Sequence, residues 1–142
     1  MSKLRILERE RRKPKRMPFK ERGKILAIVK SILEKEGYVR LVVIHGGFLN
    51  SEVFRDIDVA VYMDRRSDSN RELVYIEELR DRLEKATGIG IDIQLLNEAS
   101  PSFIHRVLSK GKVIMEKNVG TISILRIHAL EEMRRLKKGG TS

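Results

Sequence analysis

Residues 40–63 of the 142-residue chain read RLVVIHGGFLNSEVFRDIDVAVYM, and this stretch decides the expected fold. Its first six residues are mostly apolar and β-branched, and they stop at Gly46 and Gly47, as a buried strand does when it ends in a tight turn. Residues 56–63 then alternate between apolar and polar side chains, which is typical of a strand with one buried face. We therefore expect two strands joined through a glycine turn.

Two aspartates stand at the start of the second strand. Asp56 and Asp58 share one face of it, because successive side chains of a strand point to opposite sides. Two carboxylates on one face repel each other and resist desolvation, so folding alone gives little reason to pair them. A divalent cation gives a reason, since Mg²⁺ is commonly held by one or two carboxylates while substrate phosphates complete its shell.

A third acid lies on a later alternating run, residues 90–96 (GIDIQLL). Asp92 is flanked by Ile91 and Ile93, so its carboxylate would carry a desolvation cost on a central strand unless a site used it. We expect Asp92 to join Asp56 and Asp58 in the metal site.

These residues resemble the minimal nucleotidyltransferases of the DNA polymerase beta superfamily. That family's signature is Gly-Ser, a spacer, Asp-x-Asp and a third Asp one helix later. Here the chain has Gly46-Gly47, eight intervening residues, Asp56-x-Asp58 and then Asp92. The resemblance covers about residues 25–117 and implies an α/β (α+β) fold with a small mixed β-sheet packed by helices. One departure is that Gly47 stands where the family has serine, which leaves only backbone donors at that position.

The resemblance also implies a chemistry and a role for each residue. Asp56 and Asp58 would bind the metals that bridge the phosphates, and Asp92 would bind the catalytic metal and help to activate the attacking hydroxyl. Gly46 and Gly47 would lie against the nucleotide. The implied cofactors are two Mg²⁺ ions, with ATP or another nucleoside triphosphate as substrate, and the implied reaction moves AMP to an acceptor hydroxyl. Two metal ions suit this reaction because they neutralise charge on both the entering and the leaving oxygen.

Small members of this family are often antitoxins that adenylylate a tyrosine on a helical toxin of the HEPN class, which implies a HEPN-type partner protein. Residues 121–138 favour a protein acceptor, because Ile124, Ile127 and Leu130 widen the apolar face of the expected helix. Packing of that face within its own domain, or in a homo-oligomer, remains an alternative. Another alternative is that the protein is a catalytically weak or inactive binding module, in which Gly47 in place of the family's serine accounts for the lost activity.

Charge is concentrated at the start of the chain. Residues 1–22 hold ten Lys or Arg against three Glu, which gives +7 of the formal +10. We expect an extended or partly disordered arm over 1–22, one nucleotidyltransferase domain over 23–138, and a flexible C-terminus over 139–142. The arm could bind RNA through counterion release, which keeps an RNA nucleotidyltransferase or an RNA-binding protein as an alternative. A solubilising tail is the plainer interpretation.

Composition narrows the classes of function. The chain has no cysteine, which excludes disulfides, thiol catalysis and thiolate metal sites. No apolar run approaches the length of a membrane span, so we expect a cytoplasmic protein without a membrane partner.

His45 precedes the glycine turn, but a lone histidine there is more often a packing residue, and it is left out of the catalytic set. Apolar periodicity predicts helices over residues 19–36, 70–87, 101–110 and 121–138, and a last strand over 112–117.

Overall fold

The computed structural model describes residues 13–64 and 69–139. Its strands are β1 (Lys15–Arg16), β2 (Val39–His45), β3 (Val53–Phe54), β4 (Asp56–Met63), β5 (Gly90–Leu95) and β6 (Lys112–Glu116). Its helices are α2 (Phe19–Leu33), α3 (Gly47–Asn50), α4 (Ser69–Thr87), α5 (Pro101–Lys110) and α6 (Thr121–Gly139), with a short 3₁₀ turn η1 (Leu96–Glu98).

The main sheet is mixed and has four strands in the order β5-β4-β2-β6. Strand β2 is antiparallel to both β4 and β6, whereas β4 and β5 run parallel. A parallel pair needs a long crossover connection, and α4 supplies it between β4 and β5. The sequence prediction of a small mixed sheet packed by helices is confirmed.

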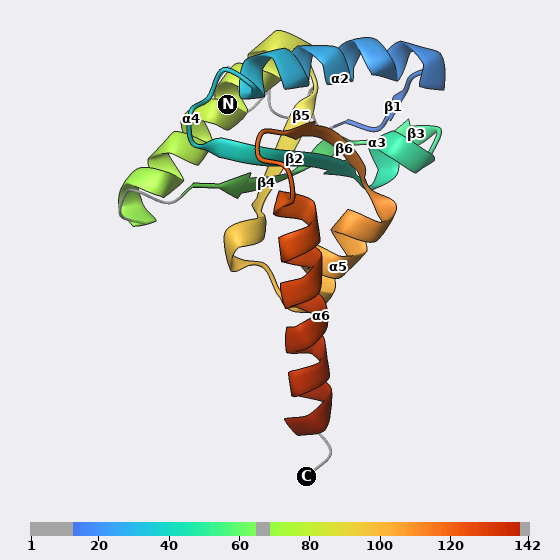
Figure 1. Ribbon diagram of the computed structural model, residues 1–142. Helices are drawn as coiled ribbons and strands as arrows, with labels where there is room; N and C mark the ends of the chain where they lie inside the picture. The colour runs from blue at the N-terminus through green and yellow to red at the C-terminus, as the bar shows by residue number, and fades with distance from the viewer. Residues whose placement is uncertain (1–12, 65–68, 140–142) are drawn as a thin grey trace.

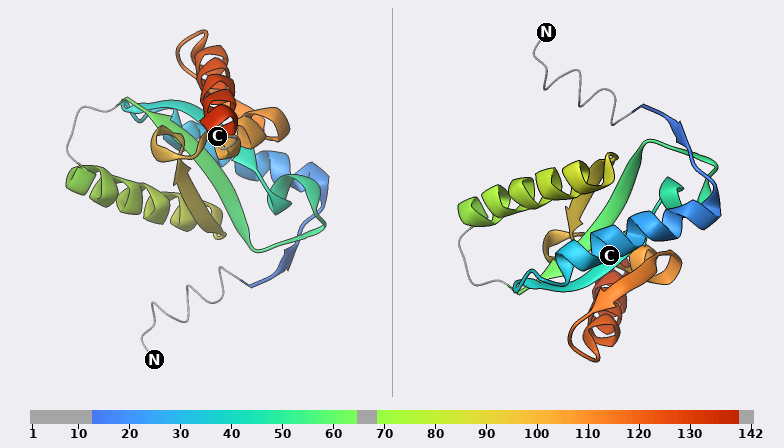
Figure 2. Two further views of the ribbon diagram at one scale, coloured as in Figure 1. Left: turned by 90° about the horizontal axis from the view of Figure 1, so that it is seen from below. Right: turned by 90° about the horizontal axis from the view of Figure 1, so that it is seen from above.

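Helices cover both faces of this sheet (Figure 1). Helices α2 and α4 lie over one face, where they are in contact with each other (Figure 2). The core on that face is built from β-strand residues such as Ile44, Ile57 and Ile91 and from helical residues such as Val29 and Leu79, all fully buried.

The opposite face carries a smaller core under α5. Leu41, Val43 and Ala60 from the sheet pack there with Val107 and Leu108 from α5. Helix α6 packs on α5 near its own start and then projects away from the sheet (Figure 1). No helix in the described ranges is long and apolar enough to cross a membrane.

The expected elements agree closely with the observed ones. The helix expected over 101–110 is α5, and the helix expected over 70–87 is α4, which is followed by Gly88 at a φ of 72°. The first helix ends at Leu33, three residues before the expected end, and a turn leads into β2.

The start of the chain differs from the expected loose arm. Strand β1 pairs with β3, and α2 begins at Phe19. Arg22 is only 3% exposed, and it lies on the same buried stripe of α2 as Leu26, Val29 and Leu33. The sequence pattern did not indicate that Arg22 is buried, because charged residues are rarely fully buried. Residues 1–12 and 140–142 of the predicted arm and C-terminus lie outside the described residues.

Candidate active site

The three acids lie on neighbouring strands at one end of the sheet. In the parallel pair of β4 and β5, Asp58 lies directly opposite Asp92, and Asp56 lies opposite Gly90. On the other side of β4, the antiparallel register places His45 of β2 opposite Asp58. Residues in register share a face of a sheet, so His45, Asp58 and Asp92 form one row across three strands. It lies on the face that α5 covers.

One part of the sequence argument for Asp92 was wrong. Strand β5 is at the edge of the sheet rather than in its middle, and Asp92 is exposed. Its carboxylate therefore carries little desolvation cost. The observation that singles out Asp92 is its register with Asp58, which places two carboxylates side by side.

Gln94 links this row of side chains. Its amide nitrogen Nε2 donates to Oδ1 of Asp58 at 3.2 Å and to Oδ2 of Asp92 at 2.9 Å. Its Oε1 is hydrogen-bonded to Nε2 of His45, whose ring also packs edge-on against Phe103 at 5.7 Å between centroids. Gln94 thus holds the two carboxylates and the histidine in one network.

Sequence reasoning assigned no role to Gln94 and left His45 out of the catalytic set. A signal for Gln94 was present, because it follows Asp92 by two positions and so shares its face of β5. The position of His45 opposite Asp58 depends on the pairing of β2 with β4, which no local pattern specifies.

The electrostatics of the row favour a cation. Burial raises the pKa of Asp58 above its ordinary value, and the charges of Asp92 and Asp56 raise it further, while His45 and the hydrogen bond from Gln94 oppose the shift. Burial and like charges both disfavour an ionised carboxylate unless positive charge is brought to it. Asp58 is therefore a carboxylate that a bound cation would stabilise.

Steric contact with Asp58 explains why the turn has glycine at position 46. This residue has a φ of 79°, and a Cβ at its position would lie 2.2 Å from Oδ2 of Asp58. Only glycine allows both the backbone conformation and the close approach of the carboxylate. Helix α3 then begins at Gly47. At Gly47 a Cβ would make ordinary contacts of 3.7 Å or more with Phe54 and Ser51.

The chemistry of these donors fits magnesium in the mode that shares its shell with a substrate. No group of three or more His, Asp or Glu side chains in residues 13–64 and 69–139 forms a ready-made metal cage. Magnesium does not need one, since one or two carboxylates and substrate phosphates hold it in many phosphoryl-transfer sites. Asp58 and Asp92, adjacent and in register, are carboxylates of that kind.

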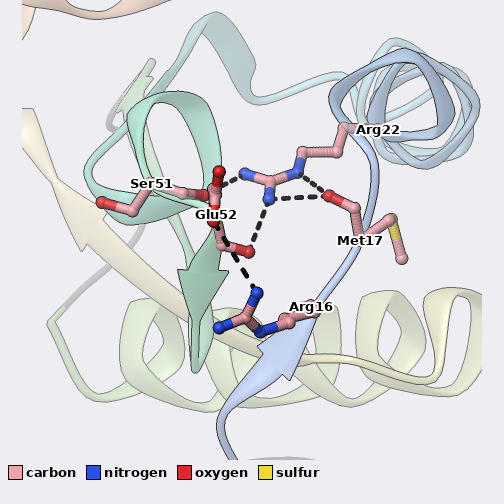
Figure 3. A network of polar contacts seen from close by, with 5 residues as sticks. All are labelled: Arg16, Met17, Arg22, Ser51 and Glu52. Atoms are coloured by element: carbon pink, nitrogen blue, oxygen red, sulfur yellow. Dashed lines mark hydrogen bonds and ion pairs between the residues drawn. The ribbon is translucent and has the colours of Figure 1, made fainter.

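Arg22 ties the end of α3, at Ser51 and Glu52, to Met17 in the N-terminal segment (Figure 3). Its guanidinium donates to the carbonyl oxygens of Phe48, Ser51 and Glu52 at 2.6–3.0 Å and twice to that of Met17. These five bonds match the five N–H groups that the side chain has. The acceptors Phe48 and Ser51 belong to α3 and its C-cap, so a buried cation fixes the short helix that follows Gly46.

Comparison with protein families gives a match over most of the domain. Residues 28–119, well over half of the chain, match the family model described as "Polymerase beta, Nucleotidyltransferase". No curated protein matches the sequence at a significant level.

Solved structures match over most of the chain. A chain of the MntA–HepT toxin–antitoxin is 18% identical and has a TM-score of 0.65, with 82% of this chain and 91% of that chain covered. A chain of the complex between a tri-AMPylated HEPN toxin and an MNT antitoxin from Shewanella oneidensis is also 18% identical, with a TM-score of 0.65 and coverages of 82% and 90%. A toxin–antitoxin structure with AMP-PNP gives 18% identity, a TM-score of 0.61 and coverages of 87% and 92%.

At these identities the structural matches establish the fold, and the family model establishes the relationship. All four strands of the main sheet, from β2 to β6, lie within the residues that the family model matches. The chain belongs to the polymerase beta nucleotidyltransferase family.

Proposed function

We propose that this protein is a magnesium-dependent nucleotidyltransferase that moves AMP from ATP to an acceptor hydroxyl on a HEPN-type partner protein in the cytoplasm. The observation that carries the proposal is the row of Asp58 and Asp92 in register beside Gly46. Asp56 completes the set from the same face of β4. The structure of a tri-AMPylated HEPN toxin with an MNT antitoxin, whose fold this chain shares, supports the choice of AMP and of the partner.

In the proposed reaction the acceptor oxygen attacks the α-phosphorus of ATP, the bond from that phosphorus to the bridging oxygen breaks, and pyrophosphate leaves. Magnesium, when bound, would neutralise charge on the entering and leaving oxygens. Asp56 and Asp58 are the residues that would hold it together with the phosphates. Asp92 would hold the second ion, and it is exposed at the sheet edge, where an acceptor hydroxyl from another protein can approach and give up its proton to the Asp92 carboxylate.

The chain residues have two further tasks. Gly46 brings backbone close to the carboxylate of Asp58, where a nucleotide phosphate would lie with no Cβ in its way. Gln94 holds Asp58 and Asp92 in fixed positions through its two hydrogen bonds. Catalysis of phosphoryl transfer consists mainly of such positioning together with charge neutralisation.

Helix α6 is the proposed partner surface. Ile124, Ile127 and Leu130 are 56%, 53% and 40% exposed along one side of the helix, which projects from the domain (Figure 1). These exposed fractions do not agree with the alternative in which the three side chains pack within their own domain. Replacing Ile127 with Asp should abolish co-purification with the co-expressed HEPN-type partner, and unchanged co-purification would refute this surface.

The test of the reaction is label transfer from α-labelled ATP, with magnesium, to a co-expressed HEPN-type partner. Asp58→Asn and Asp92→Asn should abolish labelling of the partner. Asp81→Asn is the matched control, because Asp81 is an exposed residue of α4 on the other side of the sheet. Full labelling by either Asn variant would overturn the three-acid site.

The second candidate is a binding module that neutralises its partner by contact alone. The absence of the family's serine hydroxyl at Gly47 favours it. In this case Asp58→Asn would inhibit the partner as well as the unchanged protein does, with no label transferred by either.

We also propose a single nucleotidyltransferase domain that begins earlier than residue 23. Strand β1 and Arg22 are bonded to β3 and α3, which lie inside the domain. The basic residues 1–22 remain the proposed RNA-binding segment.

A further inference from the structure

A cavity of about 310 Å³ borders the acid row on the α5 side. It is lined by His45, Gly46, Asn50, Arg106, Val107 and Lys110. His45 lies opposite Asp58 in the sheet, and Gly46 is in close contact with the Asp58 carboxylate. The cavity therefore opens directly beside the proposed metal ligands.

Two cations from α5 line this cavity. Arg106 and Lys110 are four residues apart, so they share one face of the helix. Both are exposed, and neither makes an ion pair with an acid in the described part of the chain. The guanidinium of Arg106 stacks on the ring of Phe103, with its carbon 5.3 Å from the ring centroid. This contact limits the positions that the Arg106 side chain adopts.

Close packing holds the end of α5 beside the site. A Cβ at Gly111 would lie 2.5 Å from Cγ1 of Val43 and 2.9 Å from the carbonyl oxygen of Ile44. Glycine at this position thus lets the C-terminal end of α5 approach β2 directly before His45. The position of Lys110 at the cavity is a consequence of that approach.

The cavity has the chemistry of a polyphosphate site. A ligand there would meet Arg106 and Lys110 on one side and, on the other, His45 and Gly46, which adjoin the proposed metal ligand Asp58. A guanidinium offers paired donors that match phosphate oxygens, and a lysine ammonium binds phosphate as a point charge. An uncharged acceptor hydroxyl would gain nothing from two unpaired cations.

We propose that this cavity holds the phosphate chain of the nucleoside triphosphate, with Arg106 and Lys110 binding the phosphates that leave as pyrophosphate. This inference rests on the proposed function, since it assigns residues to the same substrate. It adds α5 to a site that the acids of β4 and β5 and the glycine turn otherwise define.

The test is direct binding of ATP, ADP and AMP to the purified protein in EDTA, measured by calorimetry. The unchanged protein should bind ATP more tightly than AMP. The double variant Arg106→Gln/Lys110→Gln should bind ATP about tenfold to hundredfold more weakly, which corresponds to about 1.4–2.8 kcal/mol for the two contacts together, and should bind AMP unchanged. The thermal melting temperature should not change, since both side chains are on the surface.

The matched control is Lys24→Gln/Lys30→Gln, which removes the same charge from exposed positions of α2 on the opposite face of the sheet. It should leave ATP binding within about twofold, as expected for distant exposed charges. Equal losses in both double variants would mean that net charge, and not this cavity, binds the phosphates, and the proposal would fail.

The outcomes separate this proposal from the proposed function. If the unchanged protein transfers label while Arg106→Gln/Lys110→Gln binds ATP normally, the cavity assignment is wrong and the transferase stands. If ATP binding depends on Arg106 and Lys110 but no label is transferred, the cavity stands and the transfer reaction is wrong. An unchanged protein that binds neither ATP nor ADP, in EDTA or with magnesium, overturns both.

Discussion

Arg22→Met is expected to cost a large part of the stability of this protein. Arg22 is 3% exposed, and the variant removes the five hydrogen bonds of its guanidinium, leaving four carbonyl acceptors without this donor. The bond to Phe48 is fully buried, and those to Met17, Ser51 and Glu52 are partly buried. A buried group left unsatisfied costs about 1–3 kcal/mol.

Water can reach the partly buried carbonyls, so their contributions are smaller than that of Phe48. The ring contacts add to the loss, since the guanidinium carbon lies 4.2 Å from the centroid of Phe19 and 4.9 Å from that of Phe54. Removing the charge also removes its own desolvation cost, which offsets part of the loss. We expect a net loss of about 3–5 kcal/mol in the free energy of unfolding, out of a typical total of about 5–15 kcal/mol.

The assay is urea denaturation followed by circular dichroism. Arg16→Met is the matched control, because Arg16 lies in the same segment but its side chain is 77% exposed and its ion pair with Glu52 spans 3.7 Å (Figure 3). Such a surface pair contributes about 0–1 kcal/mol. The loss of stability in Arg22→Lys should fall between the losses in Arg22→Met and Arg16→Met, because an ammonium keeps the charge but cannot reach all four carbonyls.

The reasoning is refuted if Arg22→Met and Arg16→Met lose the same small amount of stability. A second measurement concerns α3, whose Phe48 and Ser51 carbonyls Arg22 holds. Under conditions where Arg22→Lys is still folded, its KM for ATP should rise more than its kcat falls, because the glycine turn is less well fixed.

Three further predictions concern other parts of the chain. Gly47→Ser should fold normally, since a Cβ there meets only ordinary contacts, and should raise ATP affinity in calorimetry by supplying the family's hydroxyl; an unchanged affinity would show that the backbone suffices. Burial acts to raise the pKa of Glu36, but hydrogen bonds from Tyr75 and Arg82 outweigh it and the pKa is lowered. Because the pKa of Glu36 is lower in the folded protein, its ionised carboxylate stabilises the fold above the unfolded pKa of about 4.5, and this stabilisation is lost as pH falls through the folded pKa. In urea denaturation, Glu36→Gln should therefore be less stable than the unchanged protein at pH 7 and equally stable near pH 3. A difference in stability that does not depend on pH would contradict this. Deleting residues 1–12, which leaves β1 in place, should weaken RNA binding and flatten its salt dependence in filter binding, and identical binding curves would remove the RNA alternative.

Local patterns in the sequence were sufficient for much of the fold. The alternation of residues 56–63 and 90–96 placed Asp58 and Asp92 on strands, and the apolar periodicity and Gly88 located α4. These signals succeed because side-chain direction in a strand or helix depends only on the spacing along the chain.

Local patterns failed where a residue's environment comes from distant segments. Arg22 was read as part of a solvated arm, although the carbonyls that bind it lie 26 to 30 residues further along the chain or in the preceding turn. Asp92 was argued from a central strand, but strand order is not contained in one strand's own sequence.

The sequence by itself determined the glycine turn and the placement of Asp56, Asp58 and Asp92 on strands, because periodicity is a local property, and the resemblance carried by the Gly-Gly/Asp-x-Asp spacing implied the class of fold. Only the tertiary structure decided that Asp58 and Asp92 are neighbours, that Gln94 joins them to His45, and that α5 brings Arg106 and Lys110 to the same site. The physical reason is that strand register and helix docking are set by packing between segments far apart in sequence, where burial of the two cores outweighs every local preference.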